Sequence, residues 1–153
     1  MRKRCRRQVW HPASGLEIVA QRSSKPPKSV TNRVILHMYE AIEDLRTGKM
    51  TPTSWADLAA AINAGRVLAS DKRIGYEYLD DIDRARDAAR DIAARAKTNG
   101  LKFVARAAEL QALRAFAEIH DAQLNTANAG EMSDVAYRIR QLVDSGEKVV
   151  PGD

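Results

Sequence analysis

The residues best suited to bind a ligand stand together at the start of the chain. Five cationic side chains occur within six positions, and an indole follows three residues later. These residues are Arg2, Lys3, Arg4, Arg6, Arg7 and Trp10. Clustered guanidinium and ammonium groups bind phosphates with release of counterions, and an indole stacks on an unpaired base. The cluster therefore predicts contacts with the phosphate backbone of DNA or RNA.

The same cluster is compatible with other partners. A cationic arm also binds an acidic protein partner or an anionic membrane surface, or serves only to keep a protein soluble. Residues 1–28 hold eight Lys or Arg and one acid, a net charge of +7, whereas the rest of the chain holds 17 basic and 19 acidic residues, a net charge of −2. We therefore expect a roughly neutral body that carries a basic arm, and not a body whose whole surface attracts nucleic acid.

Acidic and imidazole side chains are the next candidates for chemistry. Asp80, Asp83, Asp87 and Asp91 each precede an arginine by three or four residues (Arg84, Arg86, Arg90 and Arg95). This spacing is typical of ion pairs along an exposed helix, so no metal site is expected. The three histidines, His11, His37 and His120, lack zinc-ligand spacing and are interpreted as structural or surface residues.

No nucleotide-binding, zinc-protease or serine-hydrolase motif occurs in the sequence, and Cys5 has no base beside it. We therefore expect a protein that binds rather than catalyses, without a cofactor. The single cysteine is typical of a reducing compartment, and no apolar run approaches the roughly 18 residues of a membrane span. A cytoplasmic bacterial protein without membrane contact is the prediction.

The elements that carry these residues are predicted to be helical. Alanine is abundant and aromatic residues make up only 5% of the chain, which favours helices over strands. Apolar residues recur every three or four positions over 30–47, 52–70, 76–97, 102–128 and 133–145, with Ser133 and Asp134 expected to open the last helix. Short connections favour antiparallel packing, with 76–97 and 102–128 as a central αα-hairpin.

These patterns predict an all-α bundle of about five helices. The Pro-containing stretch 23–29 separates a flexible basic arm, 1–29, from a single helical domain, 30–147, and a C-terminal tail, 148–153. Residues 59–69 read as one continuous helix, which argues against a helix-turn-helix. Long alanine-rich helices pack closely and can leave an apolar face, so the sequence is also compatible with a homodimer.

Several scattered positions carry a family resemblance. The basic start, Trp55 and Leu58 leading to Asn63, Ile74-Gly75 before a helix, and His120-Asp121 followed by Gln123 resemble a group of short proteins from proteobacterial genomes and mobile elements. The resemblance implies a bacterial setting of phage or plasmid origin and brings no activity, cofactor or catalytic residue. Two functions remain open. One is a nucleic-acid-associated accessory or regulatory protein, and the other is a module that binds a host protein through its helical surface.

Overall fold

The chain folds as a helical bundle. The structure, a computed structural model, describes residues 15–147 and 150–151. These residues form α1 (Gly15–Ser23), α2 (Lys28–Thr47), α3 (Pro52–Lys72), the 3-10 helix η1 (Tyr76–Tyr78), α4 (Leu79–Thr98), α5 (Ala107–Thr126) and α6 (Ala129–Asp144). The described residues contain no strand, which confirms the all-α prediction.

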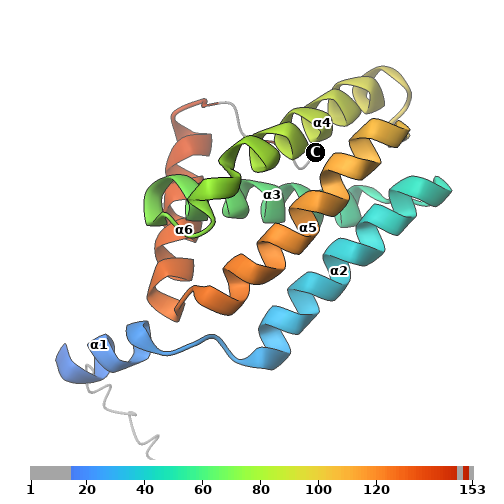
Figure 1. The fold of residues 1–153 in the computed structure, drawn as a ribbon. Helices are drawn as coiled ribbons and strands as arrows, with labels where there is room; N and C mark the ends of the chain where they lie inside the picture. Colours follow the sequence, from blue (N-terminus) through green and yellow to red (C-terminus); the bar gives the residue numbers. More distant parts are fainter. Residues whose placement is uncertain (1–14, 148–149, 152–153) are drawn as a thin grey trace, which may run out of the picture.

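Helices α4 and α5 pack as neighbours joined by a short loop, as predicted for the αα-hairpin (Figure 1). Helix α2 lies along the other side of α5, and α3 crosses behind these helices and contacts α2, α4, α5 and α6. The alanine-rich faces of α3 and α4 allow this close approach, because small side chains bring helix axes together. The helix α3 therefore joins the hairpin to α6.

Capping residues explain where two of the helices begin. The Thr51 hydroxyl accepts a hydrogen bond from the Ser54 N–H at 3.1 Å, and Pro52 occupies the first turn, where no N–H is needed. Helix α6 begins after Asn128, whose side chain accepts from the Glu131 N–H while the Glu131 carboxylate accepts from the Asn128 N–H. The helix thus starts four residues before the predicted start at Ser133, because this capping box precedes it.

The core is organised around Trp55, which is fully buried and stacks on Phe103 with ring centroids 4.7 Å apart. Its indole N–H donates to the carbonyl of Pro151 at 2.8 Å. The Asn63 side chain donates to the Val150 carbonyl at 3.0 Å and accepts from the Val150 N–H at 2.9 Å. Residues 150–151, predicted as part of a tail, are therefore bound to α3, and Val150 is buried.

The segment predicted as a flexible arm contains a helix that packs on the body. Helix α1 contacts α6 at the edge of the bundle (Figure 1). Arg22 and Lys72 both bind the Asp134 carboxylate, at 2.6 and 2.8 Å, and the Ala129 N–H donates to the Ser24 carbonyl at 2.8 Å. The helix therefore adds a sixth element to the five predicted, and residues 23–29 connect α1 to α2.

The acidic residues of α4 form ion pairs, but only two of the four expected pairs occur. Arg86 binds Asp83 at 3.2 Å and Arg90 lies 3.6 Å from Asp87, as the spacing predicted. Arg84 binds Asp81 instead of Asp80, at 2.7 Å. The side chain of the fourth arginine, Arg95, extends from α4 to α5 and binds the Glu109 carboxylate at 2.6 Å instead of Asp91. This carboxylate also accepts a hydrogen bond from the Arg106 N–H.

Candidate functional site

The binding residues predicted from the sequence fall outside the part of the chain that the structure describes. Arg2, Lys3, Arg4, Arg6, Arg7 and Trp10 all precede residue 15. The described chain starts at α1, whose Arg22 is held by Asp134. Hydrogen bonds from Lys72 and Arg22 lower the pKa of that carboxyl group, so it stays ionised at neutral pH. The described part of the predicted arm thus includes a helix that is fixed to the body.

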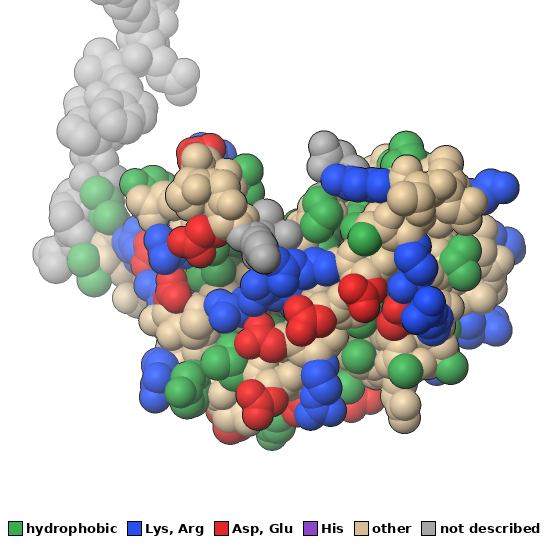
Figure 2. All heavy atoms as spheres, turned by 90° about the horizontal axis from the view of Figure 1, so that it is seen from above, with side chains coloured by type: hydrophobic (Ala, Val, Ile, Leu, Met, Phe, Trp, Pro, Cys, Tyr) green, Lys and Arg blue, Asp and Glu red, His purple; other side chains and the backbone are tan. Residues whose placement is uncertain are grey.

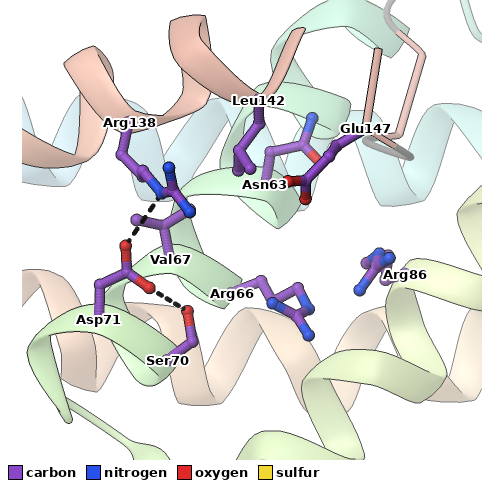
Figure 3. Close-up of a pocket in the computed structure, with 9 residues that line it drawn as sticks. All are labelled: Asn63, Arg66, Val67, Ser70, Asp71, Arg86, Arg138, Leu142 and Glu147. Carbon is purple, nitrogen blue, oxygen red and sulfur yellow. Dashed lines mark hydrogen bonds and ion pairs between the residues drawn. The ribbon is translucent and has the colours of Figure 1, made fainter. Parts of the chain in front are cut away.

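One hollow in the body collects arginines from three helices. Arg66 of α3, Arg86 of α4 and Arg138 of α6 line a cavity of about 250 Å³ (Figure 3). Figure 2 shows basic side chains gathered in a hollow on one face of the molecule, with acidic side chains beside them. We call the cavity the arginine hollow. Three guanidinium groups so close together suggest an anion site.

The ion pairs of the arginine hollow argue against that interpretation. Asp83 accepts from Arg66 at 2.9 Å and from Arg86 at 3.2 Å, and Arg138 lies 3.4 Å from Asp71. Asp71 and Glu147 belong to the lining of the cavity itself, and Asp83 binds two of its arginines from beside it (Figure 3). The three cations are therefore balanced by three carboxylates. An incoming anion would have to displace these carboxylates, so we interpret the cluster as a structural link between α3, α4 and α6.

A second concave surface is apolar and lies along α2. Its inner part, of about 300 Å³, is lined by α2, α3, α5 and α6, and its outer part, of about 200 Å³, lies beside the start of α2. Both parts share Val34, Leu124 and Met132, so they form one continuous groove. We call it the α2 groove, with an inner pocket and an outer hollow. Such mainly apolar concave surfaces are typical of ligand sites.

The inner pocket contains one buried polar side chain, His120 of α5. Its exposed fraction is 1%, and its ring stacks on Phe116 with centroids 5.2 Å apart. Its Nδ1 lies 3.0 Å from Oε1 of Gln123, one turn further along the helix. The Gln123 amide nitrogen in turn donates to the carbonyls of Gly65 at 2.9 Å and Ile74 at 2.8 Å. A buried polar chain thus joins α5 to α3 and to the loop before η1.

This chain of hydrogen bonds fixes the protonation of the imidazole. Both carbonyl partners of Gln123 are acceptors, so its NH₂ group must face them and its oxygen must face His120. Because that oxygen is also an acceptor, Nδ1 carries the proton. Burial lowers the pKa of His120 more than Gln123 and Asp121 raise it, so the ring is neutral at pH 7. Its Nε2 therefore presents a lone pair.

The spacing of His120 and Gln123 in the sequence is a signal for this buried site. His120 was interpreted as a structural or surface histidine, and the structure places it in the interior. The three-residue spacing from His120 to Gln123 puts both side chains on one face of a helix. Gly65 is a second such signal, because glycine is unusual inside a helix. In the structure, a Cβ at this position would lie 2.6 Å from the Phe116 ring. Glycine at a buried helix position marks a close approach of two helices.

Three comparisons bear on function. No family model, curated protein or solved structure matches the chain. Within residues 15–147 and 150–151, no three His, Cys, Asp or Glu side chains are grouped to hold a metal ion. None of the described helices combines the length and apolar character that a membrane span requires. The charges, contacts and cavities of this chain are therefore the indications of its function.

Proposed function

We propose that this protein is a non-enzymatic, nucleic-acid-associated accessory protein that binds phosphates through its N-terminal arm. The separation of charge along the chain carries the proposal. Residues 1–28 have a net charge of +7 and the remainder a net charge of −2. A polyanion therefore meets an excess of positive charge only at the arm.

Ion pairs within the body support this division of roles. Eight cationic side chains of residues 30–147 lie within ion-pair distance of a carboxylate. They are Arg46, Arg66, Lys72, Arg84, Arg86, Arg90, Arg95 and Arg138. Acidic side chains accordingly lie beside the basic ones on the face shown in Figure 2. A phosphate that approached these cations would compete with carboxylates already bound to them, whereas no acid occurs among residues 1–16.

The contacts that hold α1 and the following residues on the body indicate which basic side chains of residues 1–28 are available to bind phosphate. Arg22 is bound to Asp134, and Lys25 donates to the carbonyls of Asn125 and Thr126, so both are occupied within the protein. Phosphate binding is therefore assigned to Arg2, Lys3, Arg4, Arg6 and Arg7, with stacking by Trp10 on unpaired bases. Contacts of this kind position a protein on a nucleic acid without reading its sequence. The expected binding is broad in specificity.

A salt series on two matched variants tests the proposal. One variant replaces the five cations of residues 2–7 by glutamine, and the control replaces five exposed cations of the body in the same way. The control positions are Arg33, Lys49, Lys97, Lys102 and Arg140. Both variants lose the same net charge.

For duplex DNA, the logarithm of affinity of the full-length protein should fall with the logarithm of salt at a slope of about −3 to −5. The arm variant should lose this slope and the control should keep it. The proposal is wrong if the full-length protein does not bind duplex DNA, single-stranded DNA or RNA at low salt. Equal loss in both variants would show that net charge, and not the arm, drives binding.

The α2 groove favours a second candidate function, a module that binds a partner protein. In its outer hollow, Val30 and Val34 are 52% and 38% exposed, which leaves apolar surface open to a partner. The Val30→Asp variant places a charge in this hollow, and Leu36→Asp, at an exposed residue outside it, is the control. A protein retained by the wild type and by Leu36→Asp, but not by Val30→Asp, would support this function. Equal retention by all three would contradict it.

A further inference from the structure

We propose that the inner pocket of the α2 groove binds a small, mainly apolar molecule that carries one hydrogen-bond donor, and that Nε2 of His120 accepts from this donor. This inference concerns the helical body and does not depend on either function proposed above. It combines three features of the pocket: an acceptor without a partner, an apolar wall and a volume of small-molecule size.

The first feature is the unused acceptor. Nδ1 of His120 donates to Gln123, so Nε2 has only a lone pair to offer. Among the described residues, no side chain or backbone N–H donates to this nitrogen, although the histidine is 99% buried and lines the pocket. Every fully buried side-chain nitrogen or oxygen of the described residues has a hydrogen-bond partner, so Nε2 must be reachable from the pocket, where a donor supplied by a ligand can take the place of water.

The second feature is that the acceptor is held in place. The imidazole ring is stacked on the fully buried Phe116, with 17° between the ring planes. Gln123 holds Nδ1 from the other side and is itself bound to two backbone carbonyls. The ring can therefore neither flip nor swing toward another partner without breaking these bonds. Such preorganisation lowers the entropic cost of binding and fixes the direction from which a donor must approach.

The third feature is the shape and character of the remaining wall. Most of this wall is apolar, and its short alanine side chains leave the space unfilled. The apolar surface comes from Val34, Met38, Ala61, Ala64 and Leu124, and the lining also includes the exposed side chains of His37 and Asp57. The volume of about 300 Å³ lies at the lower end of the range for small-molecule sites. This combination selects a compact ring or branched chain with a single hydroxyl or N–H. A carboxylate is excluded by chemistry, because it would place an acceptor against an acceptor.

Phenol and toluene form a matched pair of probes, since they have almost the same size and differ in the donor. Phenol should saturate a single site on the full-length protein and bind about three to ten times more tightly than toluene. The ¹⁵N resonance of His120 Nε2 should move on addition of phenol, while Nδ1 keeps its proton. Equal affinity for the two probes, or an unchanged Nε2 resonance, would overturn the assignment of the acceptor.

Two leucine variants locate the site. Ala64→Leu fills the inner pocket from α3, and Ala94→Leu adds the same side chain at an exposed position of α4. Phenol binding should be lost in the first variant and retained in the second. Retention by a folded Ala64→Leu protein would show that phenol binds elsewhere. If that variant does not fold, the phenol and toluene comparison and the Nε2 resonance on the wild-type protein decide the matter.

Discussion

Replacing Gly65 by alanine sets two physical effects of known sign against each other. Alanine favours a helix over glycine by about 0.5 to 1 kcal/mol, so helix propensity alone predicts a more stable protein. In the structure, however, the new Cβ would lie 2.6 Å from Cε2 and 2.9 Å from Cζ of Phe116, and 3.0 Å from Oε1 of Gln123. These distances are shorter than a carbon contact tolerates, so the ring must move.

The surroundings of Phe116 determine how costly that movement is. The ring is fully buried and stacks on His120, which is itself held by Gln123, so a shift disturbs the whole polar chain. Overpacking of a rigid core costs about 1 to 3 kcal/mol. After the gain in propensity is subtracted, Gly65→Ala should lower the free energy of unfolding by about 1 kcal/mol, within a range of about 0 to 2.5 kcal/mol. For a protein of this size, the melting temperature should fall by about 2 to 4 °C for each kcal/mol lost.

Urea and thermal unfolding followed by circular dichroism measure the change, and two further variants isolate its cause. Ala94→Gly, at an exposed position of α4, gives the propensity difference within the same protein. Phe116→Leu removes the ring edge, so in that background Gly65→Ala should be neutral or stabilising, with a coupling energy above about 1 kcal/mol. If Gly65→Ala alone stabilises the wild type, α3 and α5 do not approach as closely as described.

Three other predictions concern hydrogen bonds and protonation. Asn63→Ala should lower the free energy of unfolding by about 2 kcal/mol, because both hydrogen bonds to Val150 are lost. Removal of residues 150–153 should then destabilise the Asn63→Ala variant less than it destabilises the wild type. The lowered pKa of His120 means that the unfolded chain binds more protons below about pH 6.5. Stability should therefore fall on acidification by at most about 1.4 kcal/mol per pH unit, and this part of the slope should be absent in His120→Gln. Burial opposes ionisation of Glu109, but the hydrogen bonds from Arg95 and from the Arg106 N–H outweigh it and lower the pKa of the carboxyl group. The ionised Glu109 therefore adds to the free energy of unfolding at neutral pH, and this stabilisation is lost as the pH falls below about 4. Glu109→Gln should cost about 1 to 2 kcal/mol at pH 7 in urea unfolding, and the difference from the wild type should shrink at acidic pH.

Helical periodicity predicted α2 to α6 because their apolar residues face the interior, those of α2, α4 and α5 in one cluster and those of α6 in a second cluster shared with α3. It predicted the ends of these helices least well where contacts with residues far away in the sequence determine them. Helix α5 was expected from residue 102 but begins at Ala107. Leu101 adopts a φ of 60°, and residues 102–106 are not helical, which lets Phe103 reach Trp55 on another helix. The stacking partner lies 48 positions away in the sequence, so periodicity within 102–128 held no signal for it.

The spacing of charges also predicted contacts within a helix and missed contacts between helices. The i to i+3 and i+4 rule identified α4 as a helix with paired charges. It could not tell that Arg95 reaches Glu109 of α5, or that Arg66 of α3 shares Asp83 with Arg86. Helix α1 was missed because the basic arm and the Pro-containing stretch flank it, and its docking depends on Asp134, more than a hundred residues away.

In the buried hydrogen-bond chain of His120 and Gln123, the fold uses every polar group except Nε2 of His120. Gln123 is required by the backbone, because without its amide the carbonyls of Gly65 and Ile74 would lose a donor in the interior. His120 is required only through Nδ1, which satisfies the Gln123 oxygen. Nε2 takes no part in these hydrogen bonds. Folding alone therefore gives no reason for Nε2 to face an apolar pocket, whereas a ligand with one donor completes the hydrogen bonding of the imidazole and fills the space beside it.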